Sequence, residues 1–124
     1  MSAKRPLDAT VVLVVEDDEL VRMSAVALLE DAGLAVTEAC DADEAWRILE
    51  RRTDIGVLFT DIDMPGSMCG KTLAEHVHAS WPEIRLVLTS GRHRLADAEV
   101  PDHGLFVSKP YRSRDVLEAI AQAR

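Results

Sequence analysis

The chain has 124 residues, of which 48% are hydrophobic and 29% charged, as expected for one soluble globular domain. Its formal net charge is −8. Residues 1–62 carry that whole excess, with 6 basic and 14 acidic residues, whereas residues 63–124 carry 8 of each. This balance argues against nucleic acid or a membrane as the main partner, because both attract clustered lysine and arginine side chains.

The two cysteines, Cys40 and Cys69, are too few for a disulfide framework or a zinc site. A single bridge between them is the alternative to free thiols in a reducing cytosol, and the sequence favours the free thiols. The longest early apolar run, residues 11–15, is too short for a signal-peptide core, and no run approaches a transmembrane span. The sequence therefore predicts a cytoplasmic protein.

Short β-branched runs alternate with amphipathic stretches after a polar segment, residues 1–9, that we expect to be loose. The first and third runs are almost continuously apolar, which is typical of strands buried on both faces. The predicted strands are residues 11–15, 34–38, 55–60, 86–89 and 105–107.

The stretches between these runs have the periodicity of amphipathic helices. Gly33 is placed to end the first helix, and Asp41 or Asp43 to cap the second. The pattern is weak between Gly91 and Gly104, where Pro101 would cut a helix short. The predicted helices are residues 21–32, 41–52, 71–80 and 113–123.

Strands that alternate with helices require parallel strands joined by right-handed crossovers. We therefore expect an α/β fold in residues 10–124: a three-layer sandwich around a doubly wound, five-stranded parallel sheet. Its fourth helix, in the weak region before Gly104, should be short or irregular.

Acidic residues follow two of the predicted strands. Glu16, Asp17 and Asp18 come directly after the first strand, and Asp61 and Asp63 follow the third. In sheets of this kind ligands bind beyond the carboxyl ends of the strands. If the first and third strands are neighbours, three or four carboxylates converge on one pocket.

Such a pocket would require protons or a cation, because two carboxylates about 4 Å apart repel by about 4 kcal/mol at an effective dielectric constant near 20. Carboxylate oxygens without histidine or cysteine suit Mg²⁺, with Mn²⁺ as a second possibility. Ser90 and Lys109 follow the fourth and fifth strands and would face a shared phosphate. Together these groups form a phosphoryl-transfer site. For a single acid such as Asp18, a helix cap or a solvated loop is the better interpretation.

With these residues in place, the sequence resembles the response-regulator receiver domains of two-component signalling. The resemblance runs from residue 11 to about residue 121, and implies the strand order 2-1-3-4-5. It rests on four short motifs in order: Val-Val-Glu16-Asp17, Asp61-Ile-Asp-Met-Pro65, Leu-Thr-Ser90-Gly and Val-Ser-Lys109-Pro110.

The resemblance implies a role for each acid. Asp61 corresponds to the phospho-acceptor and Asp17 to a direct Mg²⁺ ligand. Glu16 stands where a second acid usually acts, often through water. The backbone carbonyl of Asp63 is the expected third protein ligand of the metal. Asp63 and Arg92 occupy positions that tune phosphate lifetime in the family, where they could pair or Asp63 could affect the hydrolytic water.

The resemblance also implies a switch. Ser90 corresponds to the hydroxyl residue that turns toward the phosphoryl group, and Lys109 to the lysine that pairs with the acceptor or phosphate. Phe106 occupies the aromatic switch position. The bond between Lys109 and Pro110 would be cis, the minor isomer of X–Pro bonds.

The function implied is transfer of a phosphoryl group to Asp61 from a phosphohistidine of a sensor histidine kinase or histidine phosphotransfer protein. The face formed by the fourth helix, fifth strand and fifth helix would then change its shape. A downstream protein, which the sequence does not identify, would bind this face. Such a domain catalyses its own modification but turns over no metabolite.

Three positions add detail to this interpretation. Cys69 stands where many family members carry Asp, either as a redox-sensitive thiol or as a small residue that fills a turn. Met23 and Val26 are expected opposite the core face of the first helix. They are either partner contacts or isolated exposed apolar residues.

Three other functions compete with the interpretation as a phospho-accepting receiver. A haloacid-dehalogenase-type phosphatase would carry its Asp-x-Asp motif after the first strand, whereas here it follows the third. A toprim-like nuclease also pairs Glu with Asp-x-Asp, but its nucleic-acid partner conflicts with the charge of −8. A receiver that acts as an interaction module without phosphorylation is the stronger rival, although the acceptor, lysine and metal acids are all present.

Overall fold

The computed structural model describes residues 11–64, 68–91 and 104–122. Every strand and helix predicted within these ranges is present, with ends displaced by no more than two residues. The elements are β1 (Val11–Val15), α1 (Glu19–Asp31), β2 (Ala35–Ala39), α2 (Ala42–Arg51), β3 (Ile55–Asp61), α3 (Gly70–Ser80), β4 (Arg85–Ser90), β5 (Leu105–Ser108) and α4 (Ser113–Gln122).

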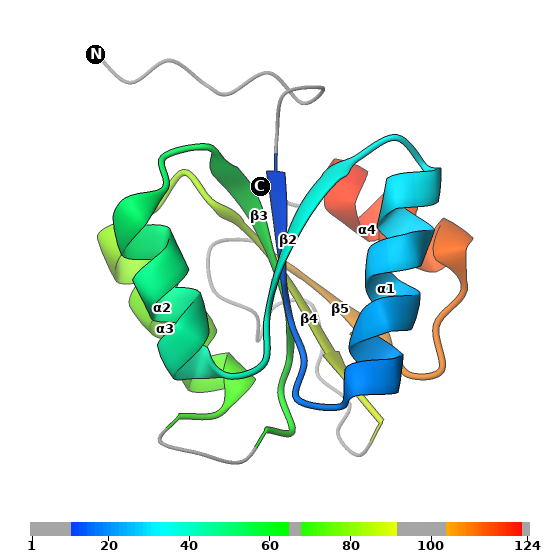
Figure 1. The fold of residues 1–124 in the computed structure, drawn as a ribbon, viewed down its shortest axis with the longest axis horizontal. Helices are drawn as coiled ribbons and strands as arrows, with labels where there is room; N and C mark the ends of the chain where they lie inside the picture. Colours follow the sequence, from blue (N-terminus) through cyan, green and yellow to red (C-terminus); the bar gives the residue numbers. More distant parts are fainter. Residues whose placement is uncertain (1–10, 65–67, 92–103, 123–124) are drawn as a thin grey trace.

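The strands form one parallel sheet in the order β2-β1-β3-β4-β5. Helices α2 and α3 cover one face of the sheet, and α1 and α4 cover the other (Figure 1). The expected α/β three-layer sandwich, doubly wound and ordered 2-1-3-4-5, is therefore confirmed. Two expectations concern residues outside the described ranges: that segment 1–9 is loose, and that the helix before Gly104 is short or irregular.

The core lies on both faces of the sheet. Every residue of β1 and β3 is buried, because these strands are covered by helices on both sides. One core cluster unites the sheet with α2 and α3 through residues such as Leu49 and Leu73. The second unites the opposite face with α1 and α4 through residues such as Leu29 and Val116. The ends of β1 and β3 are thus anchored by the buried core on both faces of the sheet.

Local signals in the sequence explain where the helices begin and end. The Asp18 carboxylate accepts a hydrogen bond from the Val21 N–H at 3.1 Å and caps α1. Asp41, rather than Asp43, caps α2 by accepting from the Glu44 N–H at 2.8 Å. Gly33 has a φ of +89°, a conformation that favours glycine after a helix. Within the described ranges, no helix is long and apolar enough to span a membrane.

The expectation for Val26 is wrong, whereas that for Met23 is confirmed. Met23 is 56% exposed, but Val26 is partly buried and packs against the core cluster under α1. Val26 follows the buried Ala25 by about 100° around the helix, so it lies beside the buried stripe rather than opposite it. Leu20, which the sequence analysis did not single out, is 75% exposed at the start of the same helix.

Gly70, the first residue of α3, lies against the backbone at the end of β3. A Cβ atom added to Gly70 would come within 2.0 Å of the backbone oxygen of Asp61. The Gly70 N–H also donates a hydrogen bond to the carbonyl of Ile62 at 3.2 Å. The helix therefore closes onto the strand with no space for a side chain.

We expect Gly70→Ala to lower the free energy of unfolding by about 2 kcal/mol, because a fixed backbone cannot yield to the added methyl group. Urea denaturation measures this loss. Gly91→Ala is the matched control, since its added Cβ would lie 3.7 Å from the nearest atom, a side-chain carbon of Lys109. Equal losses in the two variants would contradict the expectation.

Candidate functional site

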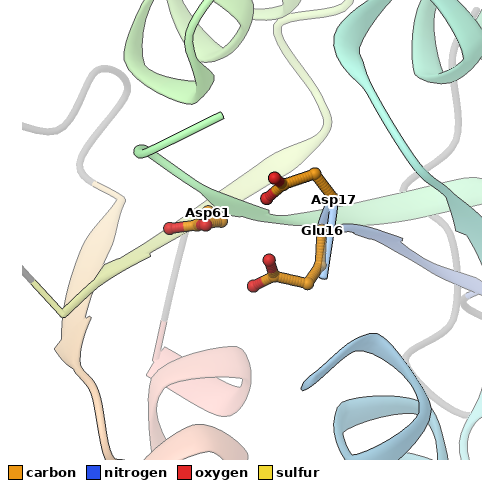
Figure 2. A group of neighbouring side chains, drawn as sticks. All are labelled: Glu16, Asp17 and Asp61. Atoms are coloured by element: carbon orange, nitrogen blue, oxygen red, sulfur yellow. The ribbon is translucent and has the colours of Figure 1, made fainter. Parts of the chain in front are cut away.

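Three carboxylates meet at the carboxyl ends of β1 and β3. The strands are neighbours and pair Val15 with Thr60, so Glu16 and Asp17 follow β1 next to Asp61. One carboxylate oxygen from each acid lies within 4.8 Å of the others (Figure 2). Glu16 and Asp61 are buried, whereas Asp17 is exposed. The cluster is thus open to solvent on the side of Asp17.

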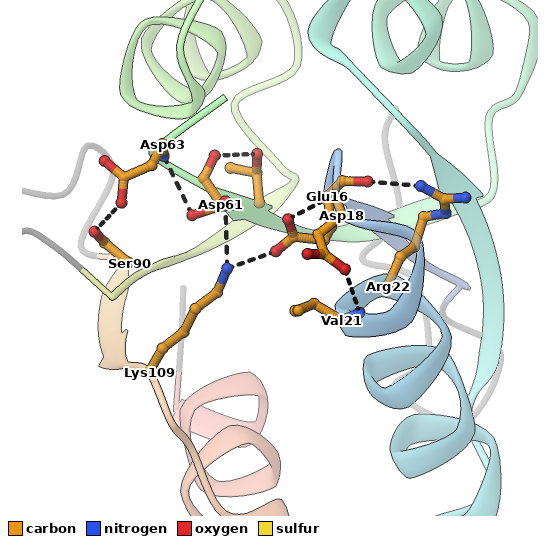
Figure 3. Close-up of polar contacts among 9 residues, drawn as sticks. Glu16, Asp18, Val21, Arg22, Asp61, Asp63, Ser90 and Lys109 are labelled. Carbon is orange, nitrogen blue, oxygen red and sulfur yellow. Dashed lines mark hydrogen bonds and ion pairs between the residues drawn. The ribbon is translucent and has the colours of Figure 1, made fainter. Parts of the chain in front are cut away.

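Lys109 contacts both buried acids (Figure 3). Its Nζ atom lies 2.6 Å from Glu16 Oε1 and 3.3 Å from Asp61 Oδ2. The Lys109 N–H donates to the carbonyl of Ser90 at 2.9 Å, which fixes the chain after β5 beside the end of β4. The bond between Lys109 and Pro110 is cis. The lysine therefore places one positive charge between two buried carboxylates.

Burial dominates the protonation of these acids. It raises the pKa of Glu16 and of Asp61 above ordinary carboxyl values, although Lys109 and backbone N–H donors oppose the shift. Burial alone would lower the pKa of Lys109, but the hydrogen bond to Glu16 and the charge of Asp61 outweigh it and raise the pKa.

The three carboxylates and one ammonium leave an excess of negative charge when all are ionised. A cation held by Glu16, Asp17 and Asp61 would neutralise it. The donor set consists of carboxylate oxygens, which fit a hard divalent cation better than a soft one.

Glu16 is held from several directions. Its Oε2 accepts the Asp18 N–H at 3.1 Å, and its backbone carbonyl accepts Arg22 Nη1–H at 2.9 Å. Arg22 Nε–H in turn donates to Glu38 of β2 at 2.9 Å. None of the sequence motifs includes Arg22. A basic residue in the first turns of a helix that follows an acidic strand end is the only signal that could have pointed to it.

Asp63 and Ser90 lie on the other side of Asp61. The Asp63 N–H donates to Asp61 Oδ1 at 3.2 Å. The Ser90 hydroxyl donates to the Asp63 carboxylate (Figure 3). The serine expected to face the phosphoryl group is thus bonded to Asp63, while Arg92, the other residue expected near Asp63, lies outside the described residues.

Two further residues singled out from the sequence lie on β5 and at the start of α3. Phe106 on β5 is partly buried and packs against the core cluster that includes Leu88. Cys69 is exposed at the N-terminal end of α3, with its Sγ atom 3.5 Å from the Thr72 hydroxyl oxygen. Hydrogen bonds from Thr72 lower the pKa of this thiol.

A doubly wound parallel sheet with three acids and a lysine gathered at its carboxyl end is the arrangement that the resemblance to receiver domains predicts. Residues 12–121 match the family model described as "Response regulator receiver domain". The chain belongs to this family.

The chain matches one relative of about its own length and one that is much longer. It is 31% identical over 112 residues to the response regulator receiver protein CpdR of Brucella abortus, covering 88% of this chain and 92% of that protein. It is 30% identical over 119 residues to the sensor kinase CckA of the same species, covering 90% of this chain. The chain spans only 12% of the length of that kinase.

A solved structure has the same fold. The crystal structure of a response regulator receiver protein from Sinorhizobium medicae superposes with a TM-score of 0.83 at 26% sequence identity. The match covers 94% of this chain and 95% of that one. The class of domain is therefore supported by sequence and by fold.

We expect Asp61→Asn to raise the free energy of unfolding by about 1 kcal/mol when no divalent cation is present. The change removes a buried charge that Glu16 and Asp17 repel, and it leaves Lys109 paired with Glu16. Urea denaturation in a chelating buffer measures the gain. Glu50→Gln removes the same charge from an exposed position on α2 and should have little effect. A loss of stability in Asp61→Asn would contradict the expectation.

Proposed function

We propose that this domain, residues 10–124, accepts a phosphoryl group on Asp61 from a phosphohistidine of a sensor histidine kinase or a histidine phosphotransfer protein. The single observation that carries the proposal is that the buried Asp61 carboxylate belongs to a cluster of three acids and lies 3.3 Å from the ammonium nitrogen of Lys109. The two free cysteines suit a cytoplasmic location, where such donors would meet it.

Each residue has a defined task in this reaction. An Asp61 carboxylate oxygen attacks the phosphorus atom, and the bond to the histidine nitrogen breaks with its electron pair on that nitrogen. Lys109 holds a positive charge beside the acceptor. Glu16, Asp17, Asp61 and the backbone carbonyl of Asp63 would hold Mg²⁺, or Mn²⁺ in its place. Such an ion would supply Lewis-acid stabilisation of the charge on the transferred group.

The product carries a signal because it changes the charge of the site. A phosphoryl group adds a charge of about −1.5 to −2. Ser90 and Lys109 are the nearby donors that can turn toward it, and the space left by Ser90 would be filled by Phe106 of the neighbouring strand β5. The partner-binding face that includes β5 would change as a result. Hydrolysis of the acyl phosphate resets the domain.

Incubation with acetyl phosphate and Mg²⁺ should add one phosphoryl group to the wild-type chain and none to Asp61→Asn. Intact mass spectrometry measures the addition. The small donor replaces the kinase, so the result depends on the chemistry of this domain alone. Failure of the wild type both to gain mass and to bind beryllofluoride, a phosphoryl mimic, would reject the proposal in favour of an interaction module that works without phosphorylation.

Asp17→Asn should weaken Mg²⁺ binding at least tenfold, because it removes a charged ligand from the solvent-facing side of the cluster. Isothermal titration calorimetry with MgCl₂ measures the affinity. Glu19→Gln is the control, since it removes the same charge two residues along, from the exposed first turn of α1. Equal weakening in the two variants would indicate a diffuse effect of charge instead of a ligand at Asp17.

A further inference from the structure

The hydrogen bond between Ser90 and Asp63 has no part in the chemistry described so far. Ser90 ends β4, is 1% exposed and directs its hydroxyl at the Asp63 carboxylate (Figure 3). A hydroxyl carries one proton and donates one strong bond at a time. While Ser90 donates to Asp63, it does not donate to a group on Asp61.

The backbone fixes Asp63 in this position. Asp61 pairs with Thr89 in the register of β3 and β4, and the Ile62 N–H donates to the carbonyl of Thr89 at 2.8 Å. The Asp63 N–H then donates to Asp61 Oδ1 at 3.2 Å. Asp63 therefore contacts the acceptor through its main chain and the serine through its side chain.

We propose that Asp63 is a positioning residue whose carboxylate holds the Ser90 hydroxyl away from Asp61 until a phosphoryl group competes for it. The inference rests on the proposed function and adds a control on its switch. A bond to a charged acceptor is among the stronger hydrogen bonds, so breaking it opposes the turn of Ser90 toward the phosphoryl group. After hydrolysis the same carboxylate recaptures the hydroxyl, which favours the resting state.

The proposal is tested with four proteins: the wild type, Asp63→Ala, Ser90→Ala and the double variant. Their affinities for beryllofluoride in the presence of Mg²⁺ are measured at one ionic strength. We expect Asp63→Ala to bind the mimic about tenfold more tightly than the wild type. In the Ser90→Ala background the same substitution should give a much smaller gain, because only the repulsion between Asp63 and the mimic is then removed.

This double-mutant cycle separates the hydrogen bond from simple charge repulsion. Equal gains in the two backgrounds would overturn the proposal, because Asp63 would then act by its charge alone. No gain in either background would also overturn it. Asp63→Asn keeps the shape of the side chain with a weaker, neutral acceptor, and should give a smaller gain of the same sign; it replaces Asp63→Ala if that variant does not fold.

A second cycle on the free proteins tests the bond without phosphoryl chemistry. The unfolding constants of the four proteins are measured by urea denaturation in a chelating buffer. We expect the two substitutions to be coupled by about tenfold in the unfolding constant, and independent effects would overturn the proposal.

The two cycles distinguish failure of this inference from failure of the proposed function. If beryllofluoride binds and the substitutions act independently, only the role of Asp63 is overturned. If none of the four proteins binds the mimic, the phosphorylation of Asp61 is rejected, and the control by Asp63 is rejected with it. Coupling in both cycles supports the proposal.

Discussion

The constraint on which this structure depends is the packing of negative charge at one edge of its sheet. Glu16 and Asp61 are buried there next to Asp17, and Lys109 is the cation that bridges the two buried acids. Burial of a charge is costly unless partners replace the lost water. Backbone N–H groups of Asp18 and Asp63 supply part of that replacement. The remaining excess of negative charge is a cost to stability that a bound cation would relieve.

The rest of the fold keeps these groups from separating. Strands β1 and β3 are buried along their whole length, so their ends cannot diverge without exposing the core. Arg22 bonds the carbonyl of Glu16 and reaches Glu38 of β2, which joins α1 to two strands. Gly70 lets α3 approach the backbone of Asp61 closely. Repulsion among the acids is therefore opposed by rigid elements, which is how a site can hold a preformed arrangement of like charges.

The sequence could predict the elements and the acidic cluster because both depend on local patterns. Continuous apolar runs marked β1 and β3, and acids directly after them must share one edge of a parallel sheet. Helical periodicity did not predict the partial burial of Val26, because a residue at the border of the buried stripe is neither clearly buried nor clearly exposed. The Arg22 bond to Glu16 depends on how α1 docks beside β2. The bond from Ser90 to Asp63 joins residues 27 positions apart through their side-chain rotamers, for which no local pattern exists.

The charges at this site also determine what kind of switch it can be. A phosphoryl group on Asp61 would add negative charge where three carboxylates already meet. The donors that could bind its oxygens are already bonded to acids. Lys109 is paired with Glu16 and Asp61, and Ser90 with Asp63. Under the proposed function, phosphorylation exchanges one charged acceptor for another and creates few new bonds. The free energy of the switch is then a small difference between strong interactions, because each donor gives up a carboxylate to gain a phosphoryl oxygen. Because this difference is small, one phosphoryl group is enough to change the domain from the resting to the switched state. Hydrolysis of that group then restores the resting state.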